Sequence, residues 1–199
     1  MSIVTLVSGG VDSSLMALLA NKEGITQHPL FIDYGQLGGK KELSSCRAIH
    51  AAYGLPEPVV LPLAGFGKVI SSGLTDRGKD IFADAFLPGR NLLFLLAGAA
   101  YAYQANASAV AIGLLSEETH LFPDQTAQFL ILAEAMLSLC MGRDIRVVAP
   151  LMKFYKSDVL ELAKSYGLTG TYSCHSGHDE PCGVCVSCRE LFSTQRKEE

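Results

Sequence analysis

The stretch IVTLVSGGVDSS, residues 3–14, decides the fold, because it joins a predicted buried strand to a predicted helix through a glycine-rich turn. The β-branched residues of its first half favour a strand. Gly9 and Gly10 permit turn conformations that other residues avoid, so successive backbone N–H groups can converge on an anion. The helix that begins near Asp12 and Ser13 adds the positive end of its dipole. The stretch therefore predicts a phosphate-binding loop after the first strand of an α/β domain.

This loop differs from two common nucleotide-binding motifs. It lacks the Gly-Lys-Ser/Thr ending of a Walker loop, and it contains no G-x-G-x-x-G. Ser8, Ser13 and Ser14 supply hydroxyl donors instead. Asp12 suits such a loop if it binds the Mg²⁺ that accompanies phosphates, or if it caps the helix.

Strands and helices are predicted to alternate along the rest of the chain. The apolar patterns predict strands at 1–7, 28–34, 59–63, 109–115 and 145–149, and helices at 13–22, 39–53, 91–104, 125–140 and 156–166. This alternation predicts an α/β fold with a doubly wound parallel sheet, whose ligands bind beyond the carboxyl ends of the strands. Residues 64–90 are too long for a routine connection, and we expect a substrate loop or lid there.

Four of the six cysteines lie close together near the C-terminus, at Cys174, Cys182, Cys185 and Cys188. We expect no secretory signal, because the first apolar run is short, and disulfides are therefore an unsuitable interpretation. The Cys-x2-Cys steps favour zinc bound by four thiolates, a closed and hence structural site. His175 or His178 in place of one cysteine, or an iron–sulfur cluster, are the alternatives. The chain thus divides into an α/β domain at 1–170 and a small C-terminal zinc-binding segment at 171–199.

The composition excludes several classes of protein. Of the 199 residues, 49% are apolar and 18% are charged, which excludes a disordered chain. The net charge of −4 argues against a broad basic surface for direct nucleic-acid binding. The longest apolar run, at 92–103, has 12 residues, fewer than the ~20 that a membrane span needs. We expect a cytoplasmic protein without a membrane segment.

Further motifs carry a resemblance to a known family. The motif S-G-G-x-D-S resembles the PP-loop of the ATP pyrophosphatase superfamily. Other motifs, in chain order, resemble those of the 7-cyano-7-deazaguanine synthase (QueC) family. They are FIDYGQ (31–36) followed by Lys41-Glu42, LTD (74–76), PGRN (88–91), FPD (122–124), PLMKFYKSDV (150–159) and EPCGVCVSCR (180–189).

The resemblance implies roles for particular residues. The loop residues would bind the phosphates of ATP together with Mg²⁺, and they are Ser8, Gly9, Gly10, Val11, Asp12, Ser13 and Ser14. Asp33 and Tyr34 would lie near the nucleoside. The residues expected to act in catalysis are Asp12, Ser13, Arg90 and Lys156. Arg90 would bind phosphate or a substrate carboxylate, and Lys156 would neutralise the departing pyrophosphate.

The resemblance also implies a reaction. ATP would adenylate the carboxylate of 7-carboxy-7-deazaguanine, ammonia would displace AMP to give an amide, and a second ATP would convert the amide to a nitrile. The family suggests a homodimer, with the apolar helices at 92–103 and 129–139 as its contact. Leu37-Gly38-Gly39 and Gln125-Thr126 replace a basic residue and a Cys-Arg pair that the family usually has. These changes motivate an alternative, in which an amine of a protein or another acceptor attacks the acyl adenylate.

Overall fold

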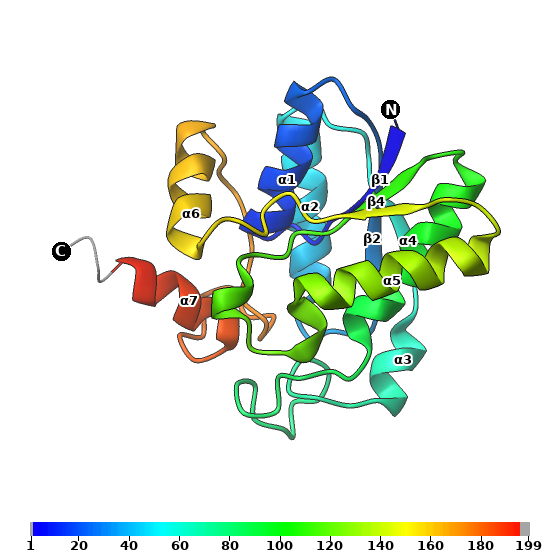
Figure 1. Ribbon diagram of the computed structural model, residues 1–199. Coiled ribbons are helices and arrows are strands. Elements are labelled where there is room, and N and C mark those ends of the chain that lie inside the picture. Colours follow the sequence, from blue (N-terminus) through cyan, green and yellow to red (C-terminus); the bar gives the residue numbers. More distant parts are fainter. Residues whose placement is uncertain (1, 196–199) are drawn as a thin grey trace.

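A single five-stranded parallel sheet forms the centre of the computed structural model, which describes residues 2–195 (Figure 1). The strands are β1 (Ser2–Leu6), β2 (Thr26–Asp33), β3 (Val59–Pro62), β4 (Ala109–Ala111) and β5 (Arg146–Val148). Their order is β3-β2-β1-β4-β5, and every neighbouring pair is parallel. The central strand sets the register, with Ile3 opposite Gln27 of β2 and Ala109 of β4. The predicted doubly wound parallel sheet is confirmed.

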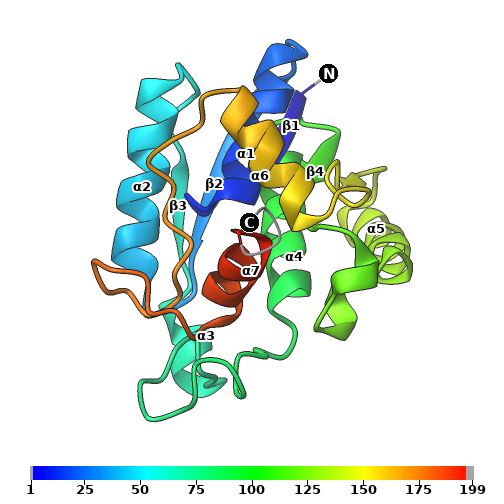
Figure 2. The same ribbon diagram turned by 90° about the vertical axis from the view of Figure 1, so that its left-hand side faces the viewer.

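Helices cover both faces of the sheet (Figures 1 and 2). One face carries α1 (Val11–Lys22), α2 (Gly39–Ala52) and α6 (Lys156–Ser165), and the other carries α4 (Arg90–Gln104) and α5 (Ala127–Met141). Successive residues of a strand point to opposite faces. Ile3 accordingly packs in the first core with Leu15 of α1, and Val4 packs in the second core with Leu95 of α4 and Leu137 of α5.

Three elements differ from the sequence prediction. The stretch 64–90 begins with a short helix, α3 (Ala64–Val69), whose two glycines conceal its pattern, although no helix or strand follows until α4. Strand β4 ends at Ala111, short of the predicted 115, although the Ile112 N–H still donates to the Val148 carbonyl of β5 at 2.9 Å. Helix α7 (Val186–Gln195) is new, and its helical pattern was hidden because its buried side consists of serine and cysteine.

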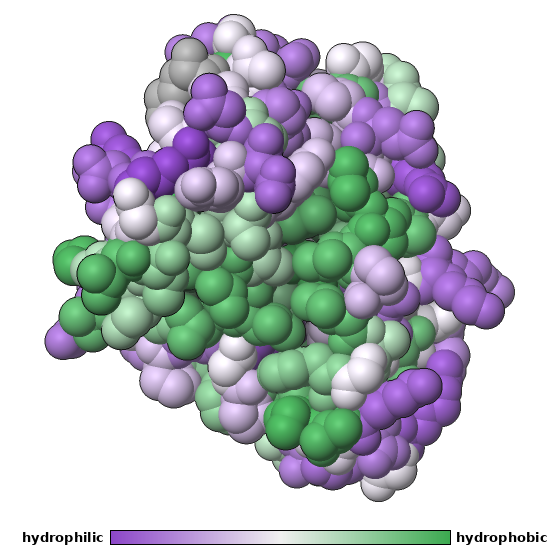
Figure 3. All heavy atoms as spheres, turned by 90° about the vertical axis from the view of Figure 1, so that its right-hand side faces the viewer, coloured by the Kyte–Doolittle hydropathy of each residue, from purple (hydrophilic) through white to green (hydrophobic). Residues whose placement is uncertain are grey.

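The exposed side of α4 and α5 is apolar and uncharged (Figure 3). We call it the α4–α5 face; its large exposed side chains are Leu92, Leu96, Tyr103, Ile131, Leu132, Met136 and Leu139. Both helices have 15 residues. Within residues 2–195, no helix combines the length and the hydropathy needed to cross a membrane.

Candidate active site and metal centre

A pocket of about 270 Å³ opens at the carboxyl ends of β1 and β4. Strands β2 and β3 lie on one side of β1 in the sheet, and β4 and β5 lie on the other side. The pocket between β1 and β4 therefore lies at the topological switch point of the sheet. Its wall includes Ser13 from the first turn of α1, Gly113 from the loop after β4, and Arg90 from the start of α4. The loop after β4 and the first turn of α1 lie close together, as a Cβ added at Gly113 would be 3.3 Å from the Ser13 nitrogen. This is where the predicted fold places a ligand.

The loop after β1 is shaped to bind an anion. Ser13 Oγ accepts a hydrogen bond from the Ser8 backbone N–H at 3.1 Å and lies 3.0 Å from Ser8 Oγ. Gly10 is the N-cap of α1 and has no side chain to cap the helix. The Val11 N–H donates to Ser173 Oγ at 3.5 Å, whereas the N–H groups of Asp12 and Ser13 have no acceptor among the described residues. These two N–H groups are therefore available for a ligand at the positive end of the helix dipole.

Gly9 locks this loop to two other parts of the chain. Its φ is +80°, and an added Cβ would lie 2.4 Å from the Glu42 carbonyl oxygen and 2.7 Å from the Cys46 nitrogen, both in α2. The Gly9 carbonyl accepts hydrogen bonds from Ser45 Oγ at 3.0 Å and from the Tyr172 N–H at 2.9 Å. The loop thus depends on a residue without a side chain at this position.

An ion pair lies at the phosphate-loop end of the pocket. Lys156 Nζ, at the start of α6, is 2.7 and 2.8 Å from the two carboxylate oxygens of Asp12. The Lys156 side chain is 10% exposed and that of Asp12 is 29% exposed. Glu190 of α7 lines the same end, where burial raises the pKa of its carboxyl group and nearby Lys156 lowers it. One cation and two carboxylates therefore gather beside the loop.

The other end of the pocket contains Arg90, Tyr34 and Glu42. The Arg90 guanidinium lies 6.0 Å from the ring centroids of both Tyr34 and Phe94. Burial raises the pKa of Tyr34 to about 12, so this phenol stays protonated near neutral pH. Burial also raises the pKa of Glu42 to about 7, although the hydrogen bond from Gln36 and the charge of Arg90 oppose the change.

The structure brings most predicted site residues together. The predicted residues that line the pocket are Ser8, Gly10, Asp12, Ser13, Tyr34 and Arg90, and Lys156 reaches it through Asp12. Three other predicted residues do not line the pocket, namely Gly9, Val11 and Ser14. Asp33 also lies outside it, and its Oδ1 accepts the Gly35 N–H at 3.0 Å. Sequence reasoning missed Glu42 and Glu190 as pocket residues, although Glu42 lies within a quoted motif and Glu190 directly follows one. It considered His175 only as an alternative metal ligand and not as a pocket residue.

The substituted loop positions have local packing roles. A Cβ at Gly38 would lie 2.8 Å from Glu42 Oε1, and one at Gly39 would lie 3.3 Å from the Gln36 amide carbon. Gln125 lines the pocket, and its Oε1 accepts the N–H groups of Leu121 and Phe122. Thr126 caps α5 by accepting the Phe129 N–H at 3.1 Å. Gln125 and Thr126 thus fix the turn that leads into α5.

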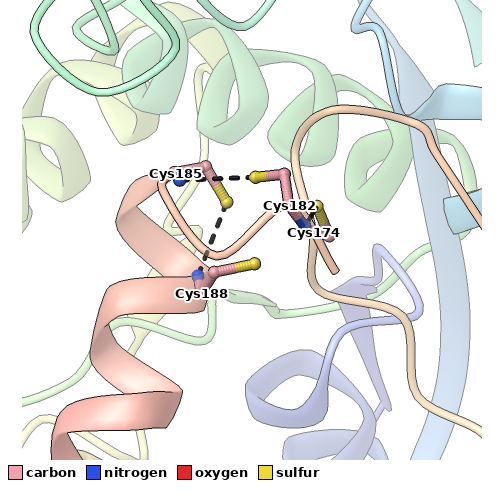
Figure 4. A group of neighbouring side chains, drawn as sticks. All are labelled: Cys174, Cys182, Cys185 and Cys188. Atoms are coloured by element: carbon pink, nitrogen blue, oxygen red, sulfur yellow. Dashed lines mark hydrogen bonds between the residues drawn. The ribbon is translucent and has the colours of Figure 1, made fainter. Parts of the chain in front are cut away.

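The four clustered cysteines form a candidate metal centre (Figure 4). The sulfur atoms of Cys174, Cys182, Cys185 and Cys188 all lie within 4.8 Å of one another. Tetrahedral zinc with Zn–S bonds of 2.3 Å needs sulfurs about 3.8 Å apart, which this cluster approaches. The N–H groups of Cys182, Cys185 and Cys188 each donate to the sulfur of the preceding cysteine of the set.

The pKa values of the cysteine thiols are shifted in different directions within the cluster. Burial raises the pKa of Cys185 and of Cys188, whereas hydrogen bonds from Ser176 and Cys182 overcome burial and lower that of Cys174 to about 6. Cys174, Cys185 and Cys188 are buried and Cys182 is half-buried. As thiolates these four neighbours would repel one another, and a divalent cation removes that cost. Within residues 2–195, the candidate ligand group contains no histidine. The cluster can hold a metal such as zinc.

Residues 171–195, which contain the four clustered cysteines and which we call the metal segment, form one wall of the pocket. This segment contributes Tyr172, Ser173, His175, Val186, Ser187 and Glu190. Burial and the charges of Arg90 and Lys156 lower the pKa of His175 to about 4, and its Nδ1 is buried without a hydrogen-bond partner in the described chain. None of the four cysteines lines this pocket. The cysteine cluster therefore supports the pocket wall and, unlike a catalytic metal centre, does not face the pocket.

Comparisons with known proteins agree with this geometry. The family described as "Queuosine biosynthesis protein QueC" matches residues 2–195. The chain is 31% identical to a 7-cyano-7-deazaguanine synthase from Nautilia profundicola, covering 94% of this chain and 89% of the relative. It is 32% identical to the synthase of that name from Methanothermobacter thermautotrophicus, covering 94% and 91%. The solved NMN synthetase from Francisella tularensis shares the fold, with a TM-score of 0.57 and 16% identity over 98% of this chain and 84% of that one.

Replacing Gly9 tests the close contact between the phosphate loop and α2. Gly142 has a φ of +63° and open space at its Cβ position, so Gly142→Ala is the matched control for the backbone conformation alone. We expect about 1–2 kcal/mol of lost stability for Gly142→Ala and at least twice that for Gly9→Ala, because α2 must also move. Denaturant unfolding measures both, and equal losses would contradict the steric argument.

Replacing Cys185 tests the metal centre. We expect the wild-type chain to bind one metal ion and Cys185→Ser to lose it, because three thiolates cannot close a tetrahedral shell. Cys140→Ser is the control, since Cys140 is exposed and lies outside the cluster. Elemental analysis counts the metal, and absorbance distinguishes colourless zinc from an iron–sulfur cluster. Full metal retention by Cys185→Ser would contradict the assignment.

Proposed function

The chain belongs to the QueC family of queuosine biosynthesis proteins, and from that premise we propose that it is an ATP-dependent 7-cyano-7-deazaguanine synthase. Its substrates are 7-carboxy-7-deazaguanine, ammonia and ATP. The observation that carries the proposal is the Asp12–Lys156 pair beside a PP-loop at the switch point of the sheet. The family and the fold make the chain an enzyme of the PP-loop ATP pyrophosphatase superfamily.

The phosphate-loop end is suited to ATP. The N–H groups of Asp12 and Ser13 in the first turn of α1 and the hydroxyls of Ser8 and Ser13 supply donors for phosphate oxygens. The Asp12 carboxylate is an oxygen ligand of the kind that Mg²⁺ prefers. When bound with ATP, Mg²⁺ neutralises phosphate charge. Lys156, released from Asp12, can then donate to the same phosphates as pyrophosphate departs.

The chemical logic requires adenylation first. A carboxylate cannot expel hydroxide, but it can expel AMP once its oxygen has attacked the α-phosphorus of ATP. Arg90 has a fork of N–H donors near the aromatic side chains of Tyr34 and Phe94, and it orients the substrate carboxylate or the α-phosphate. Ammonia then displaces AMP to give the amide, and a second ATP activates the amide oxygen before the nitrile forms. The enzyme's contribution is mainly positioning and charge neutralisation.

The metal in this proposal is zinc, and its role is structural. Four thiolates close the tetrahedral shell and leave no position for a substrate. The ion would hold residues 171–199 against the α/β domain of residues 1–170 and so keep Ser173 and Ser187 in the pocket wall. Reduced thiolates persist in a reducing compartment, which supports a cytoplasmic enzyme. The conjugation of an adenylated deazaguanine to a protein amine is not favoured, since the relatives carry the synthase name.

The α4–α5 face supports a homodimer. Its exposed side chains lie four or three residues apart along α4, at Leu92, Leu96, Ala100 and Tyr103, and therefore share one side of the helix. No exposed residue of α4 or α5 is charged. A two-fold dimer places the same patch on both partners, and an uncharged apolar face is complementary to itself.

Asp12 provides the test of the reaction. The wild-type enzyme should convert 7-carboxy-7-deazaguanine, ATP, Mg²⁺ and ammonium to the nitrile, with two AMP and two pyrophosphate per product. Asp12→Ala should slow pyrophosphate release at least a hundredfold, which corresponds to roughly 3 kcal/mol of transition-state stabilisation. Asp144→Ala, at an exposed carboxylate outside the pocket, is the control. A wild-type enzyme that releases no pyrophosphate with this substrate would refute the proposal.

Charged substitutions test the dimer. Ile131 and Leu139 are 69% and 77% exposed, and we expect Ile131→Glu/Leu139→Glu to convert a dimer to a monomer. The repelling carboxylates would face one another across the two-fold axis. Val69→Glu is the control, because Val69 is 81% exposed on α3 and lies outside the α4–α5 face. Light scattering coupled to size exclusion measures the mass, and a monomeric wild type would contradict the dimer.

A further inference from the structure

Glu42 lines the pocket from a fixed position, and the proposed function gives this residue no role. It lies in the first turn of α2, where its N–H donates to the Gly38 carbonyl at 2.9 Å. Its own carbonyl faces Gly9 of the phosphate loop so closely that a Cβ there would lie 2.4 Å away. The backbone of Glu42 therefore cannot shift without moving the loop, and its side chain extends into the pocket wall from a rigid position.

One carboxylate oxygen of Glu42 is anchored and the other is free. Gln36 Nε2 donates to Glu42 Oε2 at 3.0 Å and also lies 3.3 Å from the Ile32 carbonyl, and Gln36 Oε1 accepts the Tyr34 N–H at 3.0 Å. The amide is thereby held in one orientation. Glu42 Oε1 has no hydrogen-bond partner among residues 2–195 and lies beside the bare Cα of Gly38. A side chain at position 38 would cover this oxygen.

The groups that face Glu42 leave it both able to ionise and able to accept a proton. Arg90 from α4 favours the charged form, whereas Asp33 from the end of β2 and Cys174 from the metal segment disfavour it. The phenols of Tyr34 and Tyr172 also lie near it. Burial is the largest influence and brings the pKa to about 7. A carboxylate of this kind is half protonated near neutral pH, the condition that suits a general base.

The other ionisable groups in the pocket are less suited to this role. Asp12 is paired with Lys156, and Glu190 lies beside that pair at the phosphate end. Tyr34 has a pKa of about 12 and is protonated near neutral pH. His175 is buried, and burial together with the charges of Arg90 and Lys156 disfavours a positive charge on its ring.

We propose that Glu42 is the general base of the amidation step, and this inference rests on the proposed synthase function. The nitrogen lone pair of ammonia forms the C–N bond to the acyl carbon. The bond from that carbon to the AMP oxygen breaks, and its electron pair leaves with AMP. One proton passes from nitrogen to Oε1 of Glu42 and then to solvent. The products are the amide, AMP and one proton, so no further reactant is needed.

Single-turnover assays separate this step from adenylation. The enzyme is mixed with ATP, Mg²⁺ and 7-carboxy-7-deazaguanine to release pyrophosphate, and ammonium is then added to form the amide. We expect Glu42→Gln to slow amide formation about a hundredfold, and to slow pyrophosphate release by a factor at least ten times smaller. Glu57→Gln is the matched control, because the Glu57 side chain is 80% exposed and outside the pocket.

A pH profile distinguishes a base from a merely structural carboxylate. At a constant concentration of free ammonia, the wild-type amidation rate should rise with pH through about 7, as Glu42 loses its proton. The Glu42→Gln rate should stay flat over the same range. Hydroxylamine, which is uncharged near pH 7 and a better nucleophile, should react with the Glu42→Gln acyl adenylate with a smaller defect than ammonia. Glu42→Asp should recover part of the rate and of the pH dependence, since it retains a carboxylate.

Each outcome has one meaning. Equal slowing of pyrophosphate release and amide formation by Glu42→Gln, or an unchanged pH profile, overturns the role of Glu42 while the synthase function stands. Equal defects with hydroxylamine and ammonia also overturn it. The absence of pyrophosphate release from the wild-type enzyme instead refutes the proposed function, and the inference fails with it. Thermal unfolding of each variant verifies that the comparison is made between folded proteins.

Discussion

The carbonyl of Gly9 is the point on which the rest of the site depends. It accepts hydrogen bonds from Ser45 of α2 and from the backbone N–H of Tyr172 at the start of the metal segment. Three segments that are far apart in the sequence thus meet at one atom. The contact requires a residue with positive φ and no Cβ, because the backbone of α2 fills the space a side chain would take. Glycine at this position therefore positions Glu42 and the metal segment as well as the phosphate loop.

The pocket is electrostatically divided. At the phosphate-loop end, Lys156 and Asp12 form an ion pair and neutralise each other. At the other end, Arg90 lies among Tyr34, Phe94 and Glu42 without forming a close ion pair with the Glu42 carboxylate in the described chain. An arginine that is not already paired retains its donors for an anionic substrate. The separation suits a reaction in which phosphate leaves from one side of a carboxylate and a nucleophile arrives at the other.

Sequence reasoning predicted the fold well, because it relied on local signals. The alternation of β-branched runs and helical spacing gave all five strands, and the glycine turn gave the phosphate loop. It missed α7, because the buried side of this helix is made of Ser187 and Cys188 and so lacks an apolar helical pattern. It also missed Glu42 and Glu190 as pocket residues. Their place in the wall depends on how α2 and α7 dock, which no local pattern specifies.

The glycines at 38 and 39 acquire a physical meaning from the structure. The family usually has a basic residue in this stretch of the sequence, and this chain lacks it. In the fold, the Gly38 Cα lies between Glu42 Oε1 and the Cys174 carbonyl, and a Cβ would be 2.8 Å from the first and 3.2 Å from the second. A side chain there would have to displace the Glu42 carboxylate or the metal segment. A cationic one would also lower the Glu42 pKa and weaken it as a base. Gly38 therefore leaves Oε1 of Glu42 uncovered at the Arg90 end of the pocket, whereas Gly39 lies against the Gln36 side chain. The absence of a side chain at position 38 is consistent with the proposed amidation by a carboxylate base.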